Sequence, residues 1–267
     1  MSERALEHLL CRDRALTLAA ITIIVGSAWA YVLWLAAGMD MNGMGMDGFR
    51  MVSTGFAMVM TPVEAPWSAT EFALTFVMWT VMMVGMMTPS AAPMILIYAR
   101  AARIAAADGR PLAATGWFVG AYLLAWTTFA LAATISQWAL QRLAFLDPMM
   151  AASSAIVGAG ALLLAGIYQL TPLKRACLIN CQSPLAFIAR RGGFGTGSAS
   201  ALKLGAEHGL YCVGCCWALM ALLFVGGVMN PVWIAALAAF VKLVPGPWLS
   251  WCLGVLLIVW AVSLMVL

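Results

Sequence analysis

Charged residues are scarce in this sequence. Asp, Glu, Lys and Arg make up 9% of its 267 residues, whereas soluble domains carry about 25%. The sequence has no phosphate-binding loop, no Ser-His-Asp pattern and no pair of carboxylates that would indicate catalysis, so we do not expect an enzyme. Its basic residues are spread over several loops instead of gathering on one face, which argues against a nucleic-acid partner.

What the sequence does contain is long apolar runs. Hydrophobic residues make up 64% of the chain and the mean hydropathy is +0.98. A spanning helix needs about 20 apolar residues. One run, Pro231 to Val244, is shorter than this, and we expect it to be a short or tilted span or a re-entrant segment. We expect an all-α polytopic bundle of transmembrane helices in one domain, residues 1–267, with seven spans, or six if the short run does not cross. The long runs are Ala15–Ala37, Phe72–Ala99, Pro111–Leu140, Met149–Leu170, Gly209–Met229 and Trp248–Leu267.

Lysine and arginine are divided unequally between the two sets of loops. If the N-terminus is cytoplasmic, all of the 14 lysines and arginines fall on the cytoplasmic side except Arg50 and Arg142. Because positive residues accumulate on that side of a membrane, we expect a multi-pass protein of the cell inner (plasma) membrane with a cytoplasmic N-terminus. A Met-rich loop, residues 38–70, then lies outside, and a Cys-containing loop, residues 171–208, lies in the cytoplasm.

Five of the seven cysteines fall in two clusters, and both clusters adjoin the cytoplasmic loop. In a helix, the motif "CVGCC" and the histidine four residues before it share one stripe, and so do the two cysteines of "CLINC". Thiolate and imidazole ligands suit Cu(I) and Zn(II). A free cysteine is also a common small buried residue, which is the simpler interpretation for Cys11 and Cys252. The predicted ligands in the clusters are Cys177, Cys181, Cys212, Cys215, Cys216 and His208.

Methionine gathers in two places, the outer stretch "GMDMNGMGMDG" and the helical stretch "MWTVMMVGMMTP". The thioether is a soft, neutral ligand that favours Cu(I). We therefore predict that the outer methionines collect the ion and that Met82 and Met86, one turn apart, pass it inward. The alternatives are that the helical row fills gaps between helices and that the loop lies in lipid headgroups. The outer methionines are Met39, Met41, Met44 and Met46.

Three blocks of sequence carry a resemblance to a known family: "WTVMMVGMMTPSAAPMI", "YQLTPLKRACLINCQSP" and "GLYCVGCCWALMALLFVGGVMNPVWIAALAAF". They resemble a bacterial family of predicted metal-binding integral membrane proteins of unknown function, which is also described as copper chaperone-like. The resemblance implies a multi-span inner-membrane protein whose metal site uses the cysteines of the second and third blocks, with the methionines of the first nearby.

Three functions follow from these observations. We expect a soft-metal protein, with Cu(I) as the main ion and zinc as the other candidate, that handles copper as a transporter or membrane metallochaperone. Its partners would be the lipid bilayer, the metal ion and a periplasmic or membrane protein. The alternatives are a non-catalytic subunit or assembly factor of a membrane complex, and a membrane thiol-disulfide oxidoreductase that uses Cys212 and Cys215 as a Cys-x-x-Cys pair.

Overall fold

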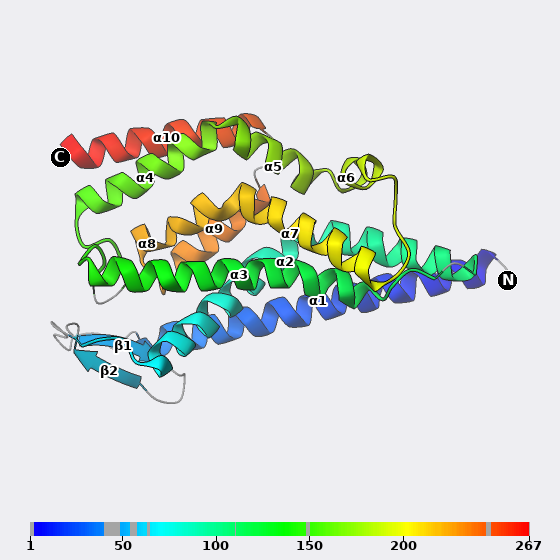
Figure 1. The fold of residues 1–267 in the computed structure, drawn as a ribbon, viewed down its shortest axis with the longest axis horizontal. Helices are drawn as coiled ribbons and strands as arrows, with labels where there is room; N and C mark the ends of the chain where they lie inside the picture. Colours follow the sequence, from blue (N-terminus) through cyan, green and yellow to red (C-terminus); the bar gives the residue numbers. More distant parts are fainter. Residues whose placement is uncertain are drawn as a thin grey trace.

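Helices make up most of the structure, a computed structural model that describes residues 3–39, 49–53, 58–62, 65–109, 111–147, 150–243 and 247–266. Within these ranges, the side chains of 3–13, 38–39, 49–60, 242–243 and 247 are not described. The helices are α1 (Glu3–Met39), α2 (Ala69–Ala107), α3 (Thr115–Arg142), α4 (Ala155–Leu170), α5 (Pro172–Gln182), α6 (Pro184–Arg190), α7 (Ser198–Ala221), α8 (Leu223–Gly226), α9 (Pro231–Leu243) and α10 (Pro247–Val266). Figure 1 shows their arrangement.

Five helical segments of the described chain are long and apolar enough to cross a membrane: Arg14–Ala37, Ala69–Ala107, Thr115–Arg142, Ser198–Gly226 and Trp248–Val266. A sixth is added if α4 and α5, which meet at an angle of 68°, form one bent span. The expected all-α class is confirmed. The count of seven stays a prediction, because α9 has only 13 residues and reaches about 20 Å of a hydrocarbon core about 30 Å thick. The cytoplasmic side of the N-terminus also stays a prediction.

Local sequence explains where several helices begin. The Ser68 hydroxyl accepts a hydrogen bond from the Glu71 backbone N–H at 3.1 Å, and the Glu71 carboxylate accepts one from the Ser68 N–H at 2.7 Å. This reciprocal capping box starts α2. Thr171 caps α5 with a single bond, in which its hydroxyl accepts from the Lys174 N–H at 3.2 Å. Pro172 occupies the first turn of α5, where its missing N–H costs nothing.

Helix α2 continues without a break through Pro89 and Pro93. Proline inside a helix removes a backbone hydrogen bond and favours a kink or a break. In a membrane, groups on neighbouring helices can satisfy the carbonyls that proline leaves free. Close to this point, the hydroxyl of Tyr122 on α3 donates to the Met87 carbonyl at 2.9 Å, which ties the two helices together.

The helices pack in pairs. In Figure 1, α1 lies beside α2, α3 beside α7, and α4 antiparallel to α10. Glycines allow the closest approaches, as expected where small residues face each other in membrane helix pairs. A Cβ atom built on Gly166 of α4 would lie 2.9 Å from the Gly254 carbonyl of α10. On α7, a Cβ atom on Gly209 would lie 2.7 Å from the Ala125 Cβ of α3.

Two expected loops contain regular structure. In the outer loop, residues 38–70, strands β1 (Phe49–Ser53) and β2 (Met58–Pro62) pair antiparallel, with Phe49 opposite Pro62. In the Cys-containing loop, residues 171–208, most of the chain is helical, because α5, α6 and the beginning of α7 lie there. As a result, the two cysteine clusters sit on defined helices.

Candidate metal centre

Helix α7 presents His208, Cys212 and Cys215 as one buried stripe. Each of these side chains is 1% exposed, and positions i, i+4 and i+7 of a helix lie on the same face. Because α7 begins at Ser198, before the predicted apolar run, Cys212 is the middle residue of the Ser198–Gly226 span. We expected these cysteines near the membrane boundary, and that depth stays a prediction, because this segment of 29 residues is longer than a bilayer core requires.

Three cysteines from two helices come together. The Sγ atoms of Cys181 on α5 and of Cys212 and Cys215 on α7 lie within 4.8 Å of one another. A metal ion bound about 2.3 Å from each of three thiolates holds the sulfurs about 4.0 Å apart in a planar arrangement, so a closure of less than about 1 Å would complete the site. The Sγ of Cys216 lies 3.2 Å from that of Cys215. We refer to Cys181, Cys212 and Cys215 as the three-thiol cluster.

Polar contacts hold α5 and the end of α4 against α7. The Lys174 ammonium donates to the Cys215 carbonyl, and the Tyr168 hydroxyl donates to the Gly214 carbonyl. Gly214 makes room for this contact, because a Cβ atom there would lie 2.8 Å from the Sγ of Cys177. Cys177 therefore faces the backbone of α7. The structure does not bring this predicted ligand into the three-thiol cluster, and Cys181, one turn later, takes that place.

His208 offers a free ring nitrogen beside the cluster. Its Nδ1 atom is buried and has no hydrogen-bond partner in the described structure. The ring lies between aromatic side chains, with centroid distances of 6.1 Å to Phe118, 5.8 Å to Tyr122 and 5.7 Å to Phe187. A buried polar atom without a partner is costly, and a metal ion is one way to satisfy it. An imidazole with three thiolates is a common donor set for a soft ion.

A cavity of about 620 Å³ connects these groups. His208 and four cysteines line it from one side, and Pro89, Ser90 and Met94 of α2 line it from the other. The Ser90 hydroxyl is also buried without a hydrogen-bond partner among the described residues. Met94, which is 1% exposed, is a thioether close to the cluster that we did not predict. The sequence did contain a signal for Met94, because it lies eight residues after Met86, which is two steps of four along the helical row of Met82 and Met86.

Met82 and Met86 lie elsewhere. Both are 1% exposed, and they line a small void beside Gly85, Ala28 and Trp29, on the side of α2 that faces α1. They do not line the cavity of the three-thiol cluster. Packing between helices, which was the alternative interpretation of this row, accounts for their position.

The predicted collection loop falls outside what the structure describes. Met41, Met44 and Met46 lie in residues 40–48, and the side chain of Met39, the last residue of α1, is not described. Their role as copper ligands stays a prediction. Of the cysteines assigned to packing, Cys252 is exposed on α10, and the side chain of Cys11 lies outside the described set.

These observations define a class of protein: an α-helical protein with several helices apolar enough to span a membrane and a group of three thiols, two of them buried, that could hold a metal ion. A family model described as "PpoB2: Copper chaperone" matches residues 76–264. This match covers well over half of the chain and contains the whole three-thiol cluster, so the chain belongs to this copper chaperone family. The resemblance seen in the sequence blocks is thereby confirmed. No curated protein and no solved structure matches the chain.

Proposed function

We propose that this protein binds Cu(I) at the three-thiol cluster, inside the inner membrane, and acts as a membrane metallochaperone. The observation that supports this most strongly is the approach of three sulfur atoms from two helices to within 4.8 Å. Membership of a copper chaperone family supports copper as the cargo. The site would hold the ion for transfer, so copper is the substrate of the protein and not a resident cofactor.

The donor set fits a soft ion. Cysteine thiolates select Cu(I), and also Zn(II), over hard cations such as Mg²⁺ and Ca²⁺. Cu(I) is satisfied by the thiolates of Cys181, Cys212 and Cys215. Zn(II) prefers four ligands in a tetrahedron and would also require His208, whose Nδ1 has no partner among the described residues. The family favours Cu(I), and direct metal competition separates the two ions.

A chaperone role is favoured over transport by the distribution of ligands. A transporter needs successive sites along a path, whereas a chaperone needs one site that can exchange its ligands with a partner. In the described part of the chain, only one group of three Cys, His, Asp or Glu ligands comes together. Met82 and Met86 lie against α1, so they form no second site on a path into the cavity that Met94 lines. Transfer would proceed by thiolate exchange, in which a sulfur of the partner binds Cu(I) as a sulfur of the cluster leaves.

The test is anaerobic metal analysis of the purified protein in detergent. Wild type, Cys212→Ser/Cys215→Ser and Cys252→Ser are loaded with Cu(I) or Zn(II) in the presence of a competing chelator. Cys252→Ser is the matched control, because Cys252 is an exposed cysteine of α10 that lies outside the cluster. We expect wild type and the control to retain one Cu(I) per chain and to prefer it to Zn(II), and we expect the double variant to lose it.

Equal retention by all three proteins, or no retention by wild type, would reject the proposal. A preference for Zn(II) that depends on His208 would change the cargo while leaving the site in place. The subunit and thiol oxidoreductase hypotheses stay predictions. The second of them requires a redox-active pair, and a reversible two-electron change in the metal-free protein would favour it over metal binding.

A further inference from the structure

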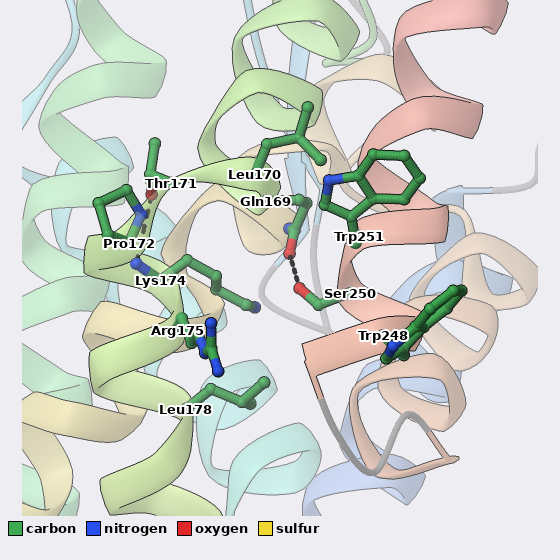
Figure 2. Close-up of a pocket in the computed structure, with 10 residues that line it drawn as sticks. All are labelled: Gln169, Leu170, Thr171, Pro172, Lys174, Arg175, Leu178, Trp248, Ser250 and Trp251. Carbon is green, nitrogen blue, oxygen red and sulfur yellow. Dashed lines mark hydrogen bonds between the residues drawn. The ribbon is translucent and has the colours of Figure 1, made fainter.

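A second cavity, of about 530 Å³, lies beside the metal centre, where the end of α4 and the beginning of α5 face the first turn of α10. Figure 2 shows its walls. Gln169, Lys174 and Arg175 come from the α4–α5 side, and Trp248, Ser250 and Trp251 come from α10. The bend of 68° between α4 and α5 separates α5 from α10 and makes this space possible.

The polar groups in this cavity are cations and hydrogen-bond donors. Lys174 and Arg175 line it, and none of its lining residues is acidic. The Lys174 side chain is 4% exposed and donates to the carbonyl of Cys215 on α7, a residue that does not line this cavity. The Arg175 guanidinium is exposed and forms no ion pair with any residue that the structure describes. Two positive charges without a carboxylate between them attract an anion, and guanidinium in particular matches the geometry of phosphate.

Gln169 supplies a buried donor to the same place. Its side chain is 4% exposed, its Oε1 accepts from the Ser250 hydroxyl at 3.0 Å, and its Nε2 has no partner among the described residues. Figure 2 shows the Gln169–Ser250 hydrogen bond between α4 and α10. A buried amide N–H₂ without an acceptor is a group that an anionic oxygen would satisfy.

The position of the cavity indicates which anion it receives. It lies where α4 ends, at Leu170, and where the span of α10 begins, at Trp248. Trp248 is 80% exposed and Trp251 is 56% exposed. Exposed tryptophans at the end of a spanning helix lie at the level of lipid headgroups, and basic pockets between helices at this level bind phosphorylated headgroups. The outer face of α10 continues as an apolar surface through Leu256, 64% exposed, against which an acyl chain can lie.

We propose that this cavity binds the phosphate of an anionic phospholipid, with Arg175 and Lys174 on the phosphate and Trp248 against the glycerol and upper acyl region. The apolar walls and the exposed tryptophans favour a lipid over free inorganic phosphate. The site does not depend on copper binding. It shares Gln169, Lys174 and Ser250 with the cavity of the three-thiol cluster, so a bound headgroup would close that cavity on the α10 side.

The experiment is native mass spectrometry of delipidated full-length protein in detergent, titrated with phosphatidylglycerol, phosphatidylcholine or inorganic phosphate. The variants are Arg175→Gln and Trp248→Leu. Lys203→Gln is the matched control, because it removes an exposed positive charge of α7 that lines neither cavity. We expect wild type and Lys203→Gln to bind one phosphatidylglycerol selectively. We expect Arg175→Gln to bind it about tenfold more weakly, the effect of losing one charge-assisted contact.

Three results would overturn the proposal: equal binding of phosphatidylcholine and phosphatidylglycerol by wild type, an equal loss in Lys203→Gln and Arg175→Gln, or displacement of the lipid by inorganic phosphate at comparable concentration. If Arg175→Gln without lipid has a lower thermal unfolding midpoint than wild type, its weaker binding could come from lost stability. In that case the binding of phosphatidylglycerol by Trp248→Leu is the deciding measurement. It keeps both charges, and it should bind phosphatidylglycerol more weakly than wild type does. Wild-type affinity in Trp248→Leu would then reject the lipid site.

Discussion

Cys177 and Cys181 lie one turn apart on α5, and the structure assigns only Cys181 to the metal centre. Replacing each of them with serine therefore tests whether metal binding depends on this arrangement or only on the number of cysteines. Cys181→Ser removes one of three sulfurs that lie within 4.8 Å of one another. Cys177→Ser changes a side chain that faces Gly214 of α7, outside the cluster.

The size of the effect follows from the geometry that remains. In Cys181→Ser, the nearest replacement sulfur is Cys216, whose Sγ is 3.2 Å from that of Cys215. If both sat about 2.3 Å from one ion, the angle between them at the ion would be about 90°, well below the roughly 109–120° of tetrahedral or trigonal sites. Cys216 therefore replaces Cys181 poorly. Loss of an outer-shell partner of a metal site already costs about 10- to 100-fold in affinity, so loss of a direct ligand should cost at least about 100-fold.

The assay is competition of each purified variant with a chromophoric Cu(I) chelator under anaerobic conditions. We expect Cys181→Ser to bind Cu(I) at least about 100-fold more weakly than wild type, and Cys177→Ser to stay within about threefold, as for a substitution away from the site. A loss in Cys177→Ser equal to that in Cys181→Ser, or wild-type affinity in Cys181→Ser, would refute the reasoning.

Three further predictions concern His208 and the contacts between helices. His208→Gln should weaken Zn(II) binding by about 10- to 100-fold and leave Cu(I) binding within about threefold, because three thiolates satisfy Cu(I) and Zn(II) needs a fourth ligand. The same competition with each ion measures this, and an equal loss of both ions, or of neither, would contradict it. Gly209→Ala should lower the unfolding free energy by about 1–3 kcal/mol, because its new Cβ would meet the Ala125 Cβ at 2.7 Å. Gly120→Ala is the control and should not lower it, because no atom lies within 4 Å of a Cβ built there. Equal unfolding midpoints of the two variants in detergent would contradict this. Gln137→Leu should cost about 1 kcal/mol, since Trp79 Nε1 donates to Gln137 Oε1 at 2.7 Å, and a denaturant titration without a shift would be the opposing result.

The sequence was most informative where the pattern was local. The spacing of His208, Cys212 and Cys215 predicts a common stripe once that segment is helical, and α7 places all three on one buried face. The start of α7 was missed, because hydropathy detects an uncharged run and not a helix. Lys203 and Glu207 interrupt the run, but they are accommodated within the helix, and Glu207 forms an ion pair with Arg191.

The choice between Cys177 and Cys181 could not be made from the sequence. Both lie on the side of α5 that approaches α7, and their roles are decided by how far the helices slide along each other. That offset depends on the bend at Pro172, on the Lys174 contact with the Cys215 carbonyl, and on the absence of a side chain at Gly214. These are tertiary features, which no single stretch of sequence encodes.

The methionine row shows the same limit. Its period of four correctly indicates that Met82 and Met86 share one face of α2, and both are buried. A period does not say which neighbour that face meets, and in this fold it meets α1. Met94, further along the helix and beyond Pro89 and Pro93, is the methionine that reaches the cavity of the three-thiol cluster.

The most direct test of the account is X-ray absorption spectroscopy of the Cu(I)-loaded protein, beside a Cys181→Ser/Cys212→Ser/Cys215→Ser variant. The account predicts a first shell of two or three sulfur atoms at about 2.3 Å, the usual metal–thiolate distance, in wild type and its loss in the variant. A first shell of only nitrogen and oxygen, or the same sulfur shell in both proteins, would contradict it.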